Sequence, residues 1–434
     1  MVDEKLIGTC KYVITENRTL VISPAEGTTG QLYLEDASGR WPWNGSDIKK
    51  VRVDGQIIVK GSAEGMFDSC AQLEDISGLA KMDVRNVKNM RCMFYNCDSL
   101  SDISPLAGWD VGCVKNMEAM FEYDTSLTDI SALSGWNVKG AKIMNGMFSF
   151  CKYISSLSPL SEWDTGSVES MEAMFYGCTS LKNLNGLSKW NVGNVKYMLY
   201  MFGCCGSVTD ISALSEWDTG NVIHMNSTFC GCCMLSDISP LEKWNVKNTT
   251  TINRMFKNCT SLEDISPLAK WDTGNITEMQ DLFNSTGIKE ADAVTDWDVK
   301  SLQDVHGVFT GTGVRENPFA EKIPMACPKT GSFTAWKKCC NGKVVELLIP
   351  EDARRSSAFG KKCRCDKAEV LRIFDKNGDP DEAAVSIYDP DFIYRIGKTL
   401  SIPDFDPDRF NECAAGIHFF MERDDAEAFL HGKR

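Results

Sequence analysis

The chain has 434 residues, of which 43% are hydrophobic and 24% are charged, values typical of a folded protein rather than a disordered one. This length exceeds one ordinary core, so we expect several domains or one elongated repeat array. The formal net charge is −14, and residues 1–316 carry −13 of it. Such a field repels a phosphate polymer, so nucleic-acid binding by this part of the chain is disfavoured.

The first residues, Met1–Leu6, have neither a basic flank nor a following apolar segment, and no apolar run is long enough to span a membrane. The sequence therefore predicts a cytoplasmic protein without a membrane span. The alternative is a place at the cell surface or in a phage particle, reached by an unrecognised route. The 19 cysteines are odd in number and many are regularly spaced, which favours free thiols over a disulfide scaffold.

Residues 62–315 repeat with a period of 27 residues, and three residue types recur in register. The phenylalanines are Phe67, Phe94, Phe121, Phe148, Phe175, Phe202, Phe229, Phe256 and Phe283, with Phe309 one residue early. The tryptophans are Trp109, Trp136, Trp163, Trp190, Trp217, Trp244 and Trp271, with Trp297 one residue early and Met82 in the first unit. The cysteines are Cys70, Cys97, Cys151, Cys178, Cys205, Cys232 and Cys259, with Asp124 in the single gap. Such columns predict a solenoid in which each unit forms one coil and like side chains stack.

Within one unit the apolar residues are spaced by three, a pattern that fits neither a long strand nor a long helix. We therefore expect the chain to turn around a shared interior. Short strands are predicted at Leu100–Ser104 and at Val114–Met117 of the unit, with a helical turn at Glu118–Phe121 and the same elements in the other units.

The unit F-x-x-C-x-S-L-x-D-I-S-x-L-x-x-W-[DN]-V-x-x-V-x-x-M-x-x-M-F closely resembles that of leucine-rich-repeat proteins similar to Bacteroides surface protein A. The resemblance covers residues 62–314. It implies a leucine-rich-repeat solenoid of short parallel β-strands and helical turns, used for adhesion and protein binding. Residues 1–61 resemble the β-rich N-terminal cap of such arrays, and a cap is also required because the first coil would otherwise expose its interior. The export signal usual in the family is absent here.

The three columns are interpreted as core. Each tryptophan ring is expected to pack on the equivalent ring of the next coil, although a row of indoles can also serve as a platform for sugars or bases. The cysteines are expected to fill space, since thiols in one line do not make a tetrahedral metal site. A partner would then contact positions that vary between units. The candidate binding-face residues are Glu74, Ser101, Thr128, Ser155, Lys182, Thr209, Ser236 and Glu263.

The period ends after Phe309. Residues 316–326 are expected to be a linker, and residues 327–434 to form a small α+β domain with a short helix at Asp424–Leu430. Its segments LLIPEDARRSSAFGKKCRCDKAEVL and RFNECAAGIHFFMERDDAEAF resemble an uncharacterised domain of phage and bacterial proteins that carry pentapeptide or leucine-rich repeats. This resemblance implies no activity.

Two groups in the C-terminal region are candidate sites. Five cations lie close together in the sequence and are either an anion-binding cluster or solvated surface. They are Arg354, Arg355, Lys361, Lys362 and Arg364. Cys413 and His418 are a candidate thiol–imidazole pair, although residues five apart on a strand point to opposite faces. The remaining cysteines match no common zinc spacing, so no metal is predicted.

The sequence as a whole predicts a non-enzymatic binding protein that presents the exposed face of a solenoid to a protein or glycan partner, with no cofactor. The alternative is a solenoid that targets an uncharacterised enzyme or effector in the C-terminal domain. A cleft that gathers Arg354, Arg355 and His418 would favour this alternative. A third possibility is a purely structural component that self-assembles.

Overall fold

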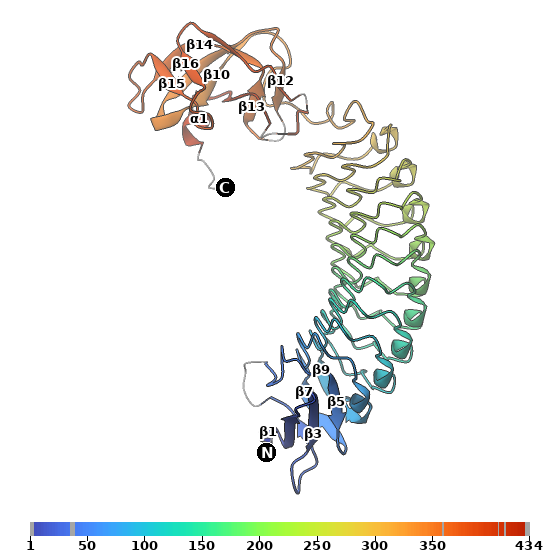
Figure 1. The fold of residues 1–434 in the computed structure, drawn as a ribbon. Coiled ribbons are helices and arrows are strands. Elements are labelled where there is room, and N and C mark those ends of the chain that lie inside the picture. The colour runs from blue at the N-terminus through green and yellow to red at the C-terminus, as the bar shows by residue number, and fades with distance from the viewer. Residues whose placement is uncertain (1–3, 35–39, 358–359, 407, 412–413, 430–434) are drawn as a thin grey trace. The chain divides into compact units, whose positions relative to one another are not determined.

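The computed structural model describes residues 4–34, 40–357, 360–406, 408–411 and 414–429 (Figure 1). The chain divides into two compact units. The first consists of Met1–Ser301 and Val308–Arg315, and the second of Leu302–Gly307 and Glu316–Arg434.

The first unit begins with small sheets. The four-stranded sheet has the order β1 (Lys5–Ile7), β2 (Cys10–Ile14), β3 (Thr19–Pro24) and β5 (Lys50–Val53), and β3 pairs with β5 in parallel. Two parallel sheets follow, made of β4 (Gln31–Leu32), β6 (Ile57–Val59) and β8 (Met82–Asp83), and of β7 (Gly61–Ser62) and β9 (Val87–Asn89). The fully buried Trp43 ring lies 6.5 Å from that of Phe67, so an indole covers the N-terminal end of the phenylalanine column.

The coils that follow consist of turns. A buried residue occupies about every third position, and its amide often donates to the carbonyl of the buried residue three positions earlier, as Leu106 does to Ile103 at 2.9 Å and Trp109 to Leu106 at 3.0 Å. Each coil has one 3-10 helix, and Figure 1 shows these helices in a row along one side of the array. They are η1 (Ser77–Lys81), η2 (Ser104–Leu106), η3 (Ser131–Leu133), η4 (Ser158–Leu160), η5 (Asn185–Leu187), η6 (Ser212–Leu214), η7 (Ser239–Leu241), η8 (Ser266–Leu268) and η9 (Asp292–Val294).

Two details of the predicted coil are wrong. No strand forms at Leu100–Ser104, where η2 begins instead, and Ala119 is left-handed with φ 55°, which excludes a helical turn at Glu118–Phe121. The parallel pairing lies in the other predicted segment, as a series of single-residue bridges such as Asn116 with Ile143. The reason is the spacing of three, because a strand alternates buried and exposed residues with a period of two.

The three columns are buried as expected, and the tryptophan rings stack in the pairs Trp163–Trp190, Trp217–Trp244 and Trp271–Trp297. Successive phenylalanine rings from Phe67 to Phe309 lie 5.4 to 5.9 Å apart and are nearly parallel. The tryptophans are buried, and each Nε1 donates to a carbonyl of the preceding coil, as Trp217 does to Leu187 at 3.1 Å. The column thiols also donate to a main-chain carbonyl, as Cys205 does to Phe175 at 3.0 Å. The interpretation of these columns as core is confirmed.

The second unit contains a seven-stranded antiparallel sheet of order β12-β13-β18-β10-β11-β14-β17. Its strands are β10 (Phe333–Lys338), β11 (Val344–Ile349), β12 (Arg355–Ser357), β13 (Lys362–Cys365), β14 (Lys367–Phe374), β17 (Thr399–Ser401) and β18 (Ile417–Phe420). A hairpin of β15 (Ala383–Val385) and β16 (Ile393–Arg395), a 3-10 helix η10 (Cys340–Gly342) and the helix α1 (Arg423–Ala428) complete it. The helix is shorter than predicted, and Leu430 lies outside the described residues.

One ammonium group is buried in this unit. Lys337 on β10 is 6% exposed, and its Nζ donates to the carbonyl of His418 at 3.2 Å and lies 5.7 Å from the centre of the Tyr394 ring. No carboxylate pairs with it among the described residues. Burial lowers the pKa of Lys337 below its ordinary value of 10.5, because a charge is poorly solvated there.

Replacing Lys337 with methionine is expected to stabilise this unit at pH 7 by about 1–3 kcal/mol, because an unpaired buried charge is removed while the volume is kept. The lowered pKa means that the lysine destabilises the fold while it is protonated, so the gain should shrink as the pH rises toward 10.5. Hydrogen exchange of the β10 amides measures the effect, with Lys376→Met at an exposed position as the control. A loss of stability at pH 7 would show that the contacts of the ammonium outweigh its burial.

Candidate binding surface

One segment of each coil has an unusual backbone that sets its surface side chains. In residues 116–123 and their equivalents, which we call the strip, alternate amides donate to the next coil. Met117 donates to Ile143 at 2.9 Å, and Tyr123 to Ser149 at 2.9 Å. Ala119 and Phe121, between them, donate to the same coil at 2.7 and 3.0 Å. This ladder is accompanied by two left-handed residues per coil, at the positions of Ala119 and Tyr123, with φ of 55° and 65°.

Aromatic residues occupy several of these left-handed positions. Tyr123, Phe150 and Tyr200 have φ of 65°, 60° and 56°, whereas other coils have glycine at the equivalent positions, for example Gly146 and Gly177. A side chain in this conformation costs about 1–2 kcal/mol that glycine does not. Most coils have a residue other than glycine at these positions, for example Cys92 and Arg254, so the left-handed backbone is a property of the whole array.

The aromatic side chains of the strip contact one another across five successive coils. The ring centres are 5.7 Å apart for Tyr95 and Tyr123, 4.6 Å for Tyr123 and Phe150, 5.1 Å for Phe150 and Tyr176, and 5.8 Å for Tyr176 and Tyr200. Tyr200 is 39% exposed and the other four are partly buried. We call these five residues the aromatic stripe. A continuous aromatic surface of this kind is typical of binding sites.

Glycines of the following coil make room for two of these rings. A Cβ atom at Gly177 would lie 3.0 Å from the Phe150 ring, and one at Gly203 would lie 2.9 Å from the Tyr176 ring. Cys204 also donates to the hydroxyl of Tyr176, with Sγ and Oη 3.4 Å apart. The rings are therefore held in place by the coil beneath them.

Carboxylates flank the stripe. Glu118 pairs with Arg91 at 3.3 Å, but Glu122 and Glu172 have no ion pair within the described part of the chain. The Glu122 carboxylate accepts from the Ser149 hydroxyl at 3.0 Å. Burial raises the pKa of Glu122, the Ser149 hydrogen bond opposes this rise, and the nearby negative charge of Glu118 adds to it. A cation brought by a partner would be favoured at this place.

A shallow groove of about 640 Å³ lies beside the later coils of the strip. It is lined by Asn194, Lys196, Asn221, Ile223, Asn248 and Thr250. The asparagine side chains form a ladder, in which Nδ2 of Asn221 donates to the Gly193 carbonyl at 2.6 Å and Asn248 to that of Gly220 at 2.7 Å. The rings of Tyr197 and His224, 5.5 Å apart, follow directly after two of the lining residues.

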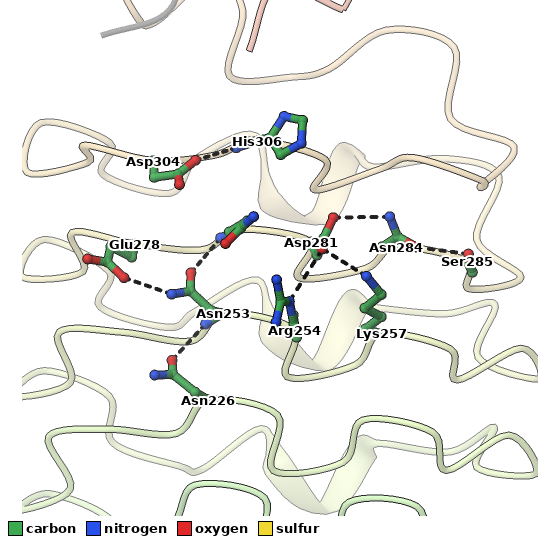
Figure 2. A network of polar contacts seen from close by, with 11 residues as sticks. Asn226, Asn253, Arg254, Lys257, Glu278, Asp281, Asn284, Ser285, Asp304 and His306 are labelled. Atoms are coloured by element: carbon green, nitrogen blue, oxygen red, sulfur yellow. Dashed lines mark hydrogen bonds and ion pairs between the residues drawn. The ribbon is translucent and has the colours of Figure 1, made fainter. Parts of the chain in front are cut away.

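In the coils that follow Tyr200, the side chains of the strip are polar and pair with one another (Figure 2). Asp281, 8% exposed, accepts from Lys257 at 2.8 Å, from Arg254 at 3.4 Å and from Asn284 at 3.1 Å. Asn253 in the same region donates to Glu278 at 2.7 Å. The charged side chains of these later coils therefore pair among themselves. The aromatic stripe differs from them because it presents apolar rings.

The candidate binding-face residues lie on another part of the coil. All eight, namely Glu74, Ser101, Thr128, Ser155, Lys182, Thr209, Ser236 and Glu263, are exposed and stack in one row. This row lies just before the 3-10 helices, where the only bridges among the described residues are those of Asn183 with Asp210 and of Lys50 with Asp75. The strand predicted at this place does not form, and none of the eight residues belongs to the strip, so their part in binding stays a prediction.

The five clustered cations are held by groups within the second unit. Arg364 is 2% exposed, and its guanidinium donates to the carbonyls of Asp406, Asp408 and Ala415. Arg354 pairs with Asp366 at 2.8 Å, and Lys361 with Asp425 at 2.7 Å.

The other two members of the cluster also have internal contacts. Arg355 donates to the carbonyls of Gly331 and Pro350, each at 2.7 Å, and Lys362 lies over the Phe429 ring at 5.7 Å. Each of the five cations therefore has a contact within the unit, and anion binding by them stays a prediction.

The candidate thiol–imidazole pair, Cys413 and His418, is only partly described. Cys413 lies outside the described residues. His418 is on β18 opposite Arg364, with its ring 6.5 Å from that of Tyr388, whereas Arg355 points to backbone carbonyls. The contacts described for Arg354, Arg355 and His418 are made with other groups and not with one another. Within the described ranges, no three His, Cys, Asp or Glu side chains are grouped as metal ligands, and no helix is long and apolar enough to cross a bilayer.

The first unit is thus a repeat solenoid of 27-residue coils with a row of contacting aromatic side chains on its surface. Residues 61–157, 133–212, 150–265 and 205–321 match the family described as "Mycoplasma protein of unknown function, DUF285". These overlapping matches span more than half of the chain, which therefore belongs to this family. Residues 323–426 match a second model, described as "Family of unknown function (DUF5758)".

Two solved structures are similar to the chain. One is a leucine-rich repeat protein from Eubacterium ventriosum, with 14% identity and a TM-score of 0.26 over 65% of this chain and 94% of that one. The other is a leucine rich cell surface protein from Faecalibacterium prausnitzii, with 14% identity and a TM-score of 0.24 over 64% of this chain and 94% of that one. No protein of curated function matches.

Proposed function

We propose that this is a non-enzymatic binding protein whose solenoid holds a macromolecular partner, a protein or a glycan, against the aromatic stripe. One observation carries the proposal. Tyr95, Tyr123, Phe150, Tyr176 and Tyr200 form an unbroken row of contacting aromatic side chains across five successive coils. Partly exposed aromatic side chains gathered on one surface are typical of sites that bind a macromolecule.

The resemblance to Bacteroides surface protein A-like proteins supports adhesion as the form of this binding, and adhesion would place the solenoid at a cell surface. The second unit is then an additional module, related by resemblance to domains of phage and bacterial repeat proteins. An enzyme in this unit has less support, because Arg354, Arg355 and His418 point to different surroundings.

A variant with Tyr123, Phe150 and Tyr200 all replaced by glycine tests the proposal. Because other coils have glycine at these positions, the fold should be kept. The full-length variant and the wild type are used to capture partners from bacterial and host surface extracts, with quantitative mass spectrometry of proteins and glycans. We expect the retained partner to be reduced at least about tenfold, equal to about 1.4 kcal/mol.

Tyr153→Ser is the matched control, because Tyr153 is 59% exposed and lies outside the stripe. It should capture as the wild type does. If the triple variant retains the same partners in the same amounts, the stripe is not the binding surface.

A further inference from the structure

We infer that the partner at the aromatic stripe is a polypeptide segment that carries arginine or lysine side chains; this inference rests on the proposed function. The inference is based on a row of contacting aromatic rings that lies beside carboxylates with no ion pair among the described residues.

The arrangement of the rings favours a polypeptide over a glycan. A sugar stacks on an open aromatic face. In the middle of the stripe, Tyr123 and Phe150 lie face to face, with planes 9° apart and centres 4.6 Å apart, so each covers one face of the other. The contacts of Tyr95 with Tyr123 and of Phe150 with Tyr176 are edge-on, at 81° and 82°. The stripe therefore offers ring edges and phenol hydroxyls, which suit the mixed apolar and polar groups of a peptide.

The carboxylates determine the charge of the partner. Glu122 and Glu172 flank the stripe and have no ion pair among the described residues. Two lysines of the neighbouring coils, Lys142 and Lys196, pair with Glu169 at 3.1 and 3.4 Å. A guanidinium placed here would pair with a carboxylate and lie against tyrosine rings at the same time.

The negative net charge of the solenoid also favours a basic partner. Residues 1–316 carry −13 of the formal net charge. This field attracts a basic segment and speeds its association, while the local carboxylates decide where it binds. Binding should therefore weaken as the salt concentration rises.

The probe is a short fluorescein-labelled peptide of alternating arginine and leucine, titrated with the full-length protein while fluorescence anisotropy is recorded. We expect Glu122→Gln with Glu172→Gln to weaken binding at least about fivefold. The matched control is Glu26→Gln with Glu290→Gln, two exposed carboxylates outside the strip, which changes the net charge equally, and its effect should be below about twofold. Equal effects of the two double variants would overturn the inference, because binding would then depend on the overall charge alone.

Two further ligands separate this inference from the proposed function. One is the same peptide with glutamate in place of arginine, and the other is the neutral glycan cellohexaose. If either binds more tightly than the arginine peptide and is lost in the triple glycine variant, the stripe is a binding surface but its partner is not basic. If the arginine peptide binds the triple glycine variant as tightly as the wild type, both proposals fail.

Discussion

Replacing Trp217 with alanine is expected to lower the free energy of unfolding of the solenoid by about 3–5 kcal/mol, the usual cost of removing a large buried ring. Trp217 is 3% exposed and stacks on Trp244, with ring centres 6.4 Å apart and planes 4° apart. Its Nε1 also donates to the Leu187 carbonyl at 3.1 Å. The variant therefore loses the contacts of this ring with Trp244 and Phe202 and one of the two hydrogen bonds to the Leu187 carbonyl, which still accepts from the Trp190 amide.

Trp217→Phe separates the two contributions, because it keeps an aromatic ring but removes the donor. We expect it to cost about 0.5–1.5 kcal/mol, the usual net contribution of one hydrogen bond, because the Leu187 carbonyl still accepts from the Trp190 amide. Urea unfolding followed by circular dichroism measures both variants. Since each coil contacts only its neighbours, hydrogen exchange should show the loss concentrated in the coils beside Trp217. A change below about 1 kcal/mol for both variants would contradict the role given to the tryptophan column.

Replacing Asp124 with cysteine is expected to stabilise the solenoid at pH 7 by about 1–3 kcal/mol, by removing an unsatisfied buried group. Asp124 stands in the cysteine column and is fully buried. Its Oδ1 accepts from the amide of Cys97 at 2.8 Å, but its Oδ2 has no partner. A thiol there should donate to the preceding coil, as the thiol of Cys151 does to the Phe121 carbonyl at 3.0 Å.

The effect should depend on pH. Burial raises the pKa of Asp124 well above its ordinary value of 3.8, so the folded state favours the neutral carboxyl. The contribution of this group is fully present below 3.8 and is lost as the pH rises through the folded-state pKa. The gain from Asp124→Cys should therefore grow between about pH 4 and pH 7, and Asp124→Asn should remove the same pH dependence. Equal gains at both pH values would show that the carboxyl ionises as freely in the fold as in the unfolded chain.

The sequence by itself determined the repeat and the core of the solenoid. The reason is that one coil contacts only its neighbours, so a period of 27 residues places every Phe, Trp and column Cys on its equivalent. The sequence also revealed the one interruption of the cysteine column, which is Asp124. The spacing of three likewise predicted a chain that turns around a shared interior.

The local geometry of the coil was decided by the tertiary structure. The sequence allowed pairing in two segments, and the ladder of coil-to-coil hydrogen bonds selected the one that contains Asn116. The position of Arg364 is another case. Its sequence neighbours suggested a solvated cation, but in the fold it donates to the carbonyls of Asp406, Asp408 and Ala415, which are distant in the chain.

The aromatic stripe also needed the structure. Its five members come from three different positions of the unit, so the intervals between them are unequal and no column reveals them. Only the left-handed backbone of the strip brings Tyr123, Phe150 and Tyr200 into one row with their neighbours. Periodicity reports what is buried, because burial is the same in every coil, whereas a binding surface is made of the side chains that differ from coil to coil.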